Sequence, residues 1–141
     1  MDPGPHKPIR VLLVDDHAGI RQALATLLEQ EGVAVCAQAG GRAEALDIVA
    51  RDPPDVALVD LSLGEDSGLA LTADLRGRGV PVVVCSTHEE PEYVRGALDA
   101  GARAYVTKRE AGEALAHAIR EVLDGWVLVS PRAADDLPDG A

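Results

Sequence analysis

The sequence predicts an α/β protein in which a doubly wound, parallel five-stranded sheet lies between two layers of helices. Three observations support this. Short β-branched and aliphatic runs alternate with longer segments whose apolar residues recur at helical spacing. Five such strand–helix units follow one another without a repeated motif, which is typical of a parallel sheet covered on both faces. Phe is absent and aromatic residues make up only 2% of the chain, so we expect a core of Val, Leu, Ile and Ala.

Length and charge restrict the functions that this chain can carry. Its 141 residues suit one domain, and 47% of them are hydrophobic. The net charge of −11 argues against direct binding to nucleic acid or an anionic membrane, and is compatible with a divalent cation or a basic partner. Cys36 and Cys85 fall in predicted strands. We therefore expect them to be small buried residues with free thiols, in a protein of a reducing compartment. No run is long enough to span a membrane and residues 1–8 lack a signal core, so we expect a cytoplasmic protein.

The first two strand–helix units are clear in the pattern of apolar residues. An apolar strand is predicted over 9–14, and five apolar residues at helical spacing predict a helix over 18–31, which Gly32 ends. A second strand over 33–38 is followed by a Gly-Gly turn. The helix after that turn reaches about Arg51, and two prolines separate it from the next strand.

The third predicted strand ends on a carboxylate. The segment from Asp55 to Leu63 consists mainly of aliphatic residues, and Asp60 lies near its end. Loop residues 64–68 follow directly. Such a run is typical of a strand buried on both faces, where a charge is rarely present for packing. We therefore interpret Asp60 as a phosphorylatable carboxylate. The remaining predicted elements are a helix over 67–77, a strand over 80–85, a helix from Pro91 to Gly101, a strand over 104–106 and a helix over 110–124.

Polar residues follow four of the five predicted strands. In the strand order 2-1-3-4-5 the carboxyl ends of these strands lie at one side of the sheet, where doubly wound folds place their sites. Three carboxylates in one crevice would raise one another's pKa or recruit a cation, and Mg²⁺ is the usual cellular choice. These residues are Asp15 and Asp16 after the first strand, Asp60 after the third, Ser86 and Thr87 after the fourth and Lys108 after the fifth.

This set suits the transfer of a phosphoryl group. The Asp60 carboxylate would be the nucleophile, and a metal together with Lys108 would neutralise the transferring oxygens. The hydroxyl of Ser86 and the backbone N–H of Thr87 would respond to the added charge. Each residue alone has an ordinary explanation as a helix cap, a turn residue or a surface charge. The agreement of four strand ends on one chemistry favours the site.

Four segments of the chain, VLLVDDH, ALVDLSLGEDSG, VVVCST and GARAYVTK, resemble the signature segments of response-regulator receiver domains. The resemblance covers residues 9–125. It implies a flavodoxin-like (βα)₅ domain that takes a phosphoryl group from a phosphohistidine on a sensor histidine kinase. It also implies a protein that is no enzyme beyond its own phosphorylation and autodephosphorylation.

The resemblance implies a role for each acidic residue. Asp60 matches the phosphoacceptor. Asp16 matches the direct ligand of Mg²⁺, and Asp15 matches a residue that binds the metal mostly through water. Ser62, two residues beyond the phosphoacceptor, would give its backbone carbonyl to the metal.

Further roles follow for the residues after the last two strands. Ser86 matches the switch hydroxyl and Lys108 the phosphate-binding lysine. Tyr105 matches the aromatic residue whose rotamer follows the switch. Ser62 and His88 lie two residues beyond the phosphoacceptor and the switch serine, where they would tune dephosphorylation.

Two positions depart from the family pattern. Many receivers have proline directly after the lysine, whereas Arg109 stands here, so the cis peptide bond of the family should be absent. Many also have proline four residues after the phosphoacceptor, where this chain has Gly64. That loop should be freer, which leaves the position of the following helix open. Neither departure removes a residue of the site.

The missing proline after Lys108, the opening DDHAGIRQAL and the ending DGWVLVSP resemble the NarL/LuxR-type branch. Members of that branch usually continue through a linker into a helix-turn-helix domain that binds DNA and regulates transcription. We expect a flexible N-terminal tail over 1–8, the receiver domain over 9–125, and a C-terminal tail or linker over 126–141 toward an output domain absent from this chain. DNA contact would then occur only through that domain.

Two other functions remain open. The chain could be a receiver-like interaction module that no longer needs phosphorylation. A haloacid-dehalogenase-type phosphatase also uses an aspartate and Mg²⁺, but it needs a second acid where this chain has Ser62. A homodimer is compatible with the apolar residues Ala114, Ala116 and Leu123 of the last helix, and helix propensity explains the alanines equally well.

Overall fold

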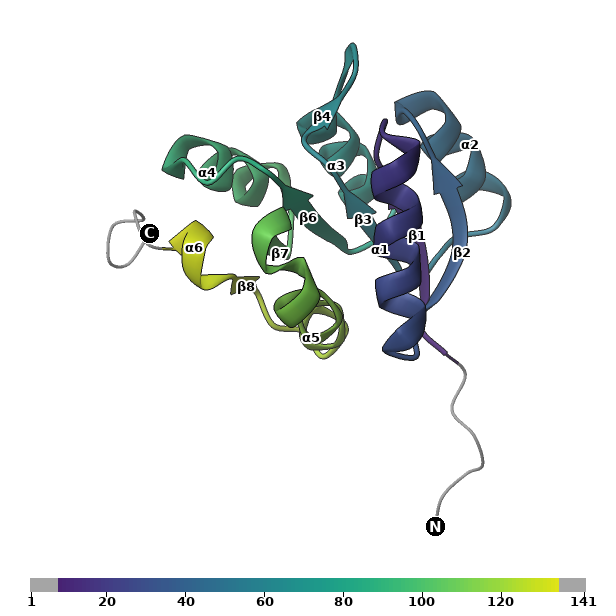
Figure 1. Cartoon of the computed structure of the whole chain (residues 1–141). Coiled ribbons are helices and arrows are strands. Elements are labelled where there is room, and N and C mark those ends of the chain that lie inside the picture. The colour runs from purple at the N-terminus through teal and green to yellow at the C-terminus, as the bar shows by residue number, and fades with distance from the viewer. Residues whose placement is uncertain (1–7, 135–141) are drawn as a thin grey trace.

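The strands of the protein lie side by side in one parallel sheet, in the order β2-β1-β3-β6-β7-β8. The structure, a computed structural model, describes residues 8–134 (Figure 1). A short hairpin takes the labels β4 and β5, so the predicted order 2-1-3-4-5 corresponds to β2-β1-β3-β6-β7 and is confirmed. The strands are β1 (Arg10–Val14), β2 (Ala34–Ala39), β3 (Val56–Val59), β6 (Val82–Ser86), β7 (Ala104–Thr107) and β8 (Leu128–Val129).

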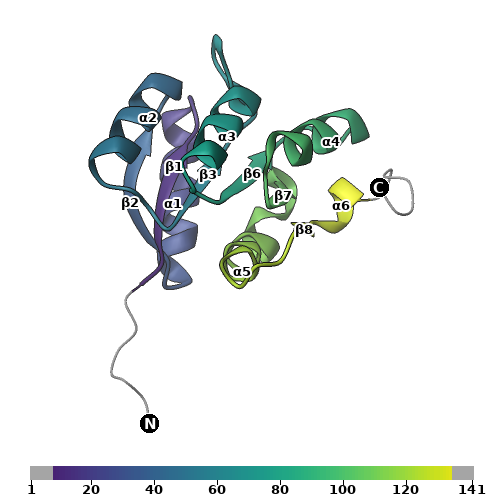
Figure 2. The ribbon, with the colours of Figure 1, turned by 180° about the vertical axis from the view of Figure 1, so that it is seen from behind.

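Helices cover both faces of the sheet, as predicted. One layer of helices lies on the face seen in Figure 1, and a second layer lies on the face seen in Figure 2. Among the described residues, no helix has the length and apolar character that a membrane crossing needs. The first layer consists of α1 (Ala18–Gln30) and α5 (Ala111–Leu123), and the second of α2 (Arg42–Arg51), α3 (Gly68–Gly77) and α4 (Pro91–Ala100).

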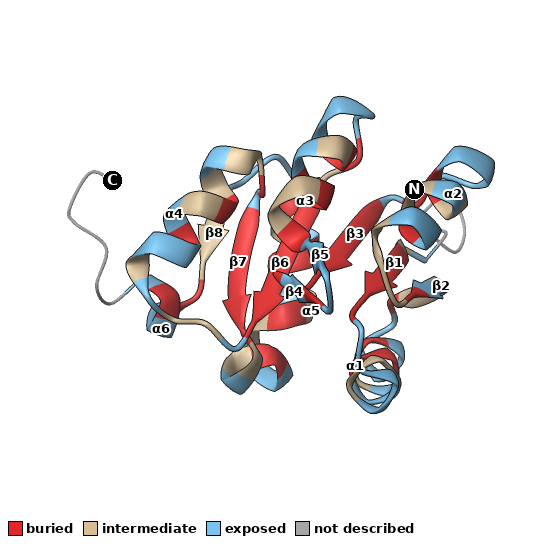
Figure 3. Ribbon diagram, turned by 90° about the horizontal axis from the view of Figure 1, so that it is seen from above, coloured by how far each residue is buried: buried red, intermediate tan, exposed pale blue. Residues whose placement is uncertain are grey.

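The core is divided into two apolar layers by the sheet itself. Along β1, Val11 and Leu13 pack toward α1 and α5, whereas Leu12 and Val14 pack toward the opposite helices. Every residue of β3 and β6 is buried, because helices cover both faces of these central strands (Figure 3). The continuous aliphatic runs in the sequence reflect this burial on two sides.

The segment after Asp60 is a hairpin rather than the loop that we predicted. Its strands β4 (Ser62–Leu63) and β5 (Asp66–Ser67) pair antiparallel and stand out from the sheet in Figure 1. Gly64 has a φ of 65°, whereas the described non-glycine residues all have negative φ, so the two-residue turn needs glycine at its first position. The Asp66 carboxylate accepts the backbone N–H of Arg42 at 3.0 Å, which fastens the hairpin to the start of α2. The Ser67 hydroxyl caps α3 by accepting the N–H of Ala70.

The chain continues the fold after α5, where only a tail or linker was expected. β8 pairs parallel with β7, and this sixth strand was not predicted. The short helix α6 (Pro131–Ala134) then packs against β7 and α4, with Ala133 only 1% exposed. Figures 1 and 2 both show α6 beside α4. Residues 1–7 and 135–141, which include most of the predicted tails, lie outside the described residues, and the predicted domain boundary at residue 125 stays a prediction.

Candidate functional site

Two buried carboxylates lie side by side where β1 and β3 end. Asp15 is 2% exposed and Asp60 is 6% exposed. Their backbone positions are set by the sheet, because the Asp15 N–H donates to Ala39 of β2 and the Asp60 N–H donates to Val14 of β1. The parallel arrangement thus brings two acids that are 45 residues apart in sequence to the same side of the sheet.

Lys108 joins these two carboxylates. It begins the 3₁₀ turn η1 (Lys108–Glu110), which follows β7 directly. Its Nζ atom lies 2.7 Å from Oδ2 of Asp15 and 2.9 Å from Oδ2 of Asp60. The peptide bond from Lys108 to Arg109 is trans, like the other described peptide bonds. Three residues that the sequence placed at one side of the sheet are therefore in direct contact.

The electrostatics of this contact are unequal for the lysine and the acids. Burial raises the pKa of Asp60 above 3.8, and the hydrogen bond and charge of Lys108 offset this only partly. Burial lowers the pKa of Lys108, but two carboxylate partners outweigh burial and raise it above 10.5. Both pKa values are raised, which disfavours the charged form of Asp60 and favours the charged form of Lys108, because one ammonium is shared by two acids. Burial also raises the pKa of the Cys85 thiol to about 12, so this thiol is protonated at neutral pH.

Asp16 and His17 complete the acidic part of the site. One ligand atom from each of Asp15, Asp16 and His17 lies within 4.8 Å of the others. Nδ1 of His17 is 3.0 Å from Oδ1 of Asp16 and 3.6 Å from Oδ1 of Asp15. The sequence analysis missed His17, although it directly follows the two acids in the VLLVDDH segment.

The donor set fits a hard divalent cation. The buried Asp15 and Asp60 share a single lysine, and the exposed Asp16 adds a third carboxylate beside Asp15, which leaves an excess of negative charge. The ligand atoms that lie within 4.8 Å of one another come from Asp15, Asp16 and His17. Asp60 is not part of this group, and its Oδ2 accepts a hydrogen bond from Lys108. A cation that prefers oxygen ligands would favour the third carboxylate over the imidazole.

The residues after β6 form a second part of the site. Ser86 is fully buried and pairs in register with Thr107, the residue before Lys108. The Ser86 hydroxyl accepts the backbone N–H of His88 at 3.2 Å. Tyr105 is also fully buried, and its hydroxyl donates to the His88 carbonyl at 2.7 Å. Thr87, between Ser86 and His88 in sequence, is exposed. Among the described residues, neither Ser86 nor Thr87 forms a hydrogen bond to the acids of the site.

Two aromatic rings hold the loop after Ser86 against α4. The imidazole of His88 stacks on the ring of Tyr93, with centroids 4.0 Å apart and planes inclined by 14°. Burial raises the pKa of Tyr105 to about 12, so its hydroxyl stays a donor at neutral pH. The Tyr105 hydroxyl therefore connects β7 to the loop that carries His88.

A close backbone approach positions Asp60 from the side of α3. The N–H of Gly68 donates to the Leu61 carbonyl at 3.0 Å. A Cβ atom at Gly68 would lie 2.1 Å from the carbonyl oxygen of Asp60 and 2.5 Å from Cα of Leu61. Only glycine fits this position without a backbone shift. The sequence analysis assigned Gly68 to a loop and did not recognise this requirement.

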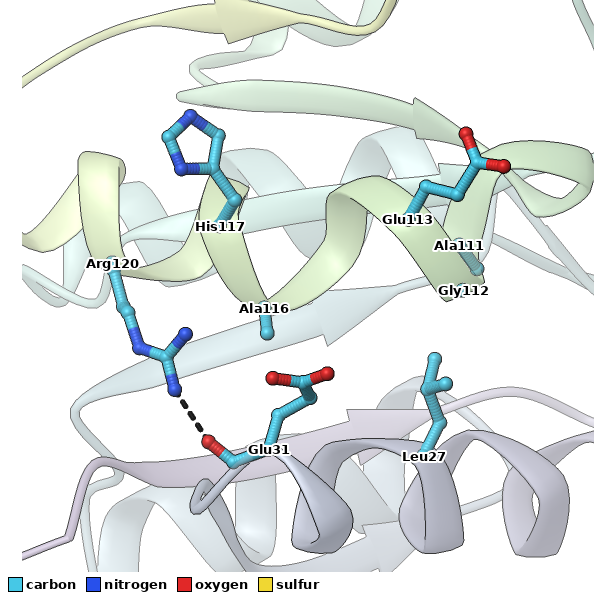
Figure 4. Close-up of a pocket in the computed structure, with 8 residues that line it drawn as sticks. All are labelled: Leu27, Glu31, Ala111, Gly112, Glu113, Ala116, His117 and Arg120. Atoms are coloured by element: carbon cyan, nitrogen blue, oxygen red, sulfur yellow. Dashed lines mark hydrogen bonds between the residues drawn. The ribbon is translucent and has the colours of Figure 1, made fainter.

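A small cavity of about 110 Å³ lies elsewhere, between α1 and α5 (Figure 4). Leu27 of α1 and Glu31, which follows that helix, face Ala116 and Arg120 of α5 across it. Arg120 donates a hydrogen bond to the Glu31 carbonyl. None of the acidic site residues lines this cavity. The candidate site at the ends of the strands is therefore separate from this cavity.

Comparison with known proteins gives the family. Residues 11–120 match the family model described as response regulator receiver domain. The chain belongs to the response regulator receiver domain family. This match places it in two-component signalling, among receiver domains rather than conventional enzymes.

The relatives are regulators of the NarL/LuxR type, as the sequence segments indicated. The DNA-binding transcriptional activator DevR/DosR of Mycobacterium tuberculosis is 36% identical over 129 residues, which are 89% of this chain and 59% of that protein. The transcriptional regulatory protein UhpA of Escherichia coli is 35% identical over 133 residues, which are 94% of this chain and 67% of that protein. The chain thus spans about three fifths to two thirds of the length of these curated relatives.

A solved structure confirms the fold. The chain is similar to a two-component response regulator of the LuxR family from Aurantimonas sp. SI85-9A1, with 31% sequence identity and a TM-score of 0.87. The match covers 92% of this chain and 95% of that one. The predicted flavodoxin-like fold is therefore confirmed both by the strand order and by a structural neighbour.

Proposed function

We propose that this chain is a phosphorylation-controlled receiver in which Asp60 accepts a phosphoryl group from a sensor histidine kinase. The observation that carries the proposal is the position of Lys108 Nζ between the carboxylates of Asp15 and Asp60. A lysine held this way is ready to move from a carboxylate oxygen to a phosphoryl oxygen. A merely structural ion pair would need only one of the two acids.

The Asp60 carboxylate is well placed as the nucleophile. Its Oδ1 accepts the Ser62 N–H at 3.3 Å and its Oδ2 accepts Lys108, so both oxygens are oriented before the reaction. In the transfer, an Asp60 oxygen forms the new bond to phosphorus while the bond from phosphorus to the donor histidine nitrogen breaks. That nitrogen keeps the bonding electrons. Lys108 then neutralises an oxygen of the transferred group.

The residues that would hold Mg²⁺ are Asp15, Asp16, Asp60 and the backbone carbonyl of Ser62. When bound, the cation supplies positive charge against the transferring phosphoryl oxygens. Asp16 would provide a carboxylate for it even while Lys108 occupies Oδ2 of Asp15 and Oδ2 of Asp60. The protein residues alone would leave this excess of negative charge unbalanced.

The switch would act through the residues after β6 and β7. Phosphorylation adds roughly −1.5 to −2 charges beside existing carboxylates, and these need new donors. The Ser86 hydroxyl, the Thr87 N–H and Lys108 are the donors at the adjacent strand ends. Tyr105 would pass a shift of this loop to the region of α4, β7 and α5, because its hydroxyl holds the His88 carbonyl.

Ser62 and His88 would tune the rate at which the phosphoryl group is lost. Ser62 donates its N–H to Asp60, so its backbone lies next to the reacting carboxylate. The His88 ring is held on Tyr93 and would have to leave that stack to reach an attacking water. We therefore expect the strength of the stack to influence how long the phosphoryl group survives.

The partners follow from the family. We infer a sensor histidine kinase as phosphodonor, a cytoplasmic location, and transcriptional control through a DNA-binding output domain outside these 141 residues. A homodimer through α5 also remains a proposal, supported by Leu123, which is 37% exposed. In this organisation the receiver covers residues 9–125, and residues 126–141 lead toward the output domain.

The test uses a small phosphodonor in place of the kinase. The wild-type chain incubated with acetyl phosphate and Mg²⁺ should gain the mass of one phosphoryl group, whereas Asp60→Asn should gain none. Asp47→Asn is the matched control, because Asp47 is an exposed aspartate of α2 whose side chain is 66% exposed. Labelling of Asp60→Asn would refute Asp60 as the acceptor. A folded wild-type chain that takes no label would favour the phosphorylation-independent interaction module.

A further inference from the structure

The Glu110 carboxylate collects hydrogen bonds from two distant parts of the chain. The Thr107 hydroxyl at the end of β7 donates to Oε1 of Glu110 at 2.7 Å. The Ser130 hydroxyl donates to the same oxygen at 2.8 Å, and the Arg132 N–H lies 3.2 Å from Oε1 and 3.3 Å from Oε2. Ser130 and Arg132 belong to residues 126–134, which we call the C-terminal segment. Glu110 therefore bridges β7 and the C-terminal segment.

This bridge is closed and partly buried. Thr107 is fully buried and Ser130 is 1% exposed. The Thr107 N–H donates to the Ser130 hydroxyl at 3.3 Å, which completes a ring of three residues. Further bonds join the backbones, since the N–H of Ser130 donates to the Tyr105 carbonyl at 2.9 Å. The C-terminal segment is thus attached to β7 by main-chain bonds and to the following turn by Glu110.

Glu110 lies at one end of the same short turn that carries Lys108 at its other end. The turn is a three-residue 3₁₀ helix, so only Arg109 separates Lys108 from Glu110. Glu110 also precedes the first residue of α5, yet its side chain makes no capping hydrogen bond to that helix. Its carboxylate is used instead on the C-terminal segment. An ordinary surface glutamate would instead point to solvent.

We propose that Glu110 is a positioning residue that couples the C-terminal segment to Lys108 and, through Lys108, to Asp60. This inference rests on the proposed function. With the segment attached, the turn is held where Lys108 reaches Asp60. A phosphoryl group on Asp60 that binds Lys108 would in return hold the turn and favour attachment of the segment, since such coupling is reciprocal.

The first experiment measures attachment without phosphorylation. Hydrogen exchange of the full chain is followed by mass spectrometry in peptides that cover the C-terminal segment. Glu110→Ala and Ser130→Ala should each speed exchange there roughly three- to tenfold, the scale of one or two lost hydrogen bonds. Glu113→Ala, which removes an exposed glutamate one turn later in α5, should leave exchange unchanged. Unchanged exchange in both Glu110→Ala and Ser130→Ala would overturn the bridge.

The second experiment measures the coupling to Asp60. The rate of labelling by acetyl phosphate with Mg²⁺ should fall roughly three- to tenfold in Glu110→Ala and in Ser130→Ala, and the double variant should be no slower than the slower single one. Ser130→Ala is the sharper variant, because Ser130 is 22 residues from Lys108 in sequence and, within residues 8–134, its side chain bonds only Glu110 and Thr107. Glu113→Ala should label like the wild type.

The outcomes separate this inference from the proposed function. Faster exchange together with unchanged labelling would leave the bridge as a structural anchor and overturn the coupling. A wild-type chain that takes no label would overturn the proposed function and the coupling with it, while the exchange experiment would still decide on the bridge. If Glu110→Ala fails to fold, Ser130→Ala decides both measurements alone.

Discussion

Carboxylates at the two ends of the turn η1 differ in how their charge is compensated. On one side, Asp15 and Asp60 share the ammonium of Lys108, and burial raises the pKa of Asp60. On the other side, burial raises the pKa of Glu110 as well, but hydrogen bonds from Thr107 and the C-terminal segment outweigh it and lower that pKa. The carboxyl groups of Asp60 and Glu110 thus have opposite pKa shifts.

The difference teaches how to tell a reactive carboxylate from an anchoring one. Around Glu110 the donors are hydroxyls and a backbone N–H, which satisfy the charge without attracting a ligand. Around Asp60 the acids outnumber the lysine, so negative charge remains for a cation or an electrophile. Counting donors for each carboxylate separates the two groups more clearly than burial does.

The largest disruption of the Asp60 side should come from Gly68→Ala. The added Cβ would lie 2.1 Å from the Asp60 carbonyl oxygen, so the backbone of Asp60 or of α3 must shift. We expect the free energy of unfolding to fall by roughly 3 kcal/mol or more, as strong overpacking does. Denaturant unfolding followed by circular dichroism measures this loss.

Gly77→Ala is the control on the same helix. Nothing lies within 4 Å of a Cβ atom at Gly77, so alanine there should leave stability unchanged or raise it by up to about 1 kcal/mol. Equal effects of the two substitutions would show that α3 does not press against Asp60.

Without metal, Asp60→Asn should stabilise the protein, by less than Gly68→Ala destabilises it. The raised pKa means that the ionised carboxylate weakens the fold, and this penalty is absent below pH 3.8 and grows as pH rises through the pKa of the folded state. With a chelator at pH 7, Asp60→Asn should raise the free energy of unfolding by on the order of 1 kcal/mol, because it removes a buried charge and its repulsion by Asp15, partly offset by the lost bond to Lys108. The gain should shrink on acidification. A variant that is less stable than the wild type at pH 7 would contradict the unbalanced-charge interpretation.

The smallest change in stability, a loss, is expected for Glu110→Gln. A lowered pKa means that the carboxylate contributes stability above pH 4.5, which is lost as pH falls through the pKa of the folded state. At pH 7 the variant should lose roughly 0.5–1 kcal/mol, since solvent screens this partly exposed group. Unfolding curves of both proteins between pH 3 and pH 7 should converge at the acid end. Curves that stay parallel would show that the charge of Glu110 does not hold the C-terminal segment.

The sheet order and the contact of Asp15, Asp60 and Lys108 could be predicted from the sequence. Their strands are long apolar runs, and parallel strands bring their carboxyl ends to one side of the sheet whatever the helices between them do. The residue that follows each strand is therefore readable without coordinates. The same reasoning placed Ser86 beside Lys108, one strand away.

Other features could not be read in this way because they depend on contacts between distant segments or on very short elements. β8 and the hairpin of β4 and β5 have two residues per strand, too few to show any alternation. The need for glycine at position 68 arises from the backbone of Asp60, and the hydrogen bonds of Glu110 arise from Ser130 and Arg132. Neither leaves a local pattern in the sequence.

The pairing of Leu128 and Val129 with β7 has a consequence for how the protein can be shortened. β7 is buried along its whole length, and β8 occupies the hydrogen-bonding groups on its outer side. A fragment that stopped at residue 125 would expose those N–H and C=O groups next to apolar side chains, which is a template for pairing with another molecule and for aggregation. A fragment that runs through Ala134 keeps this strand covered.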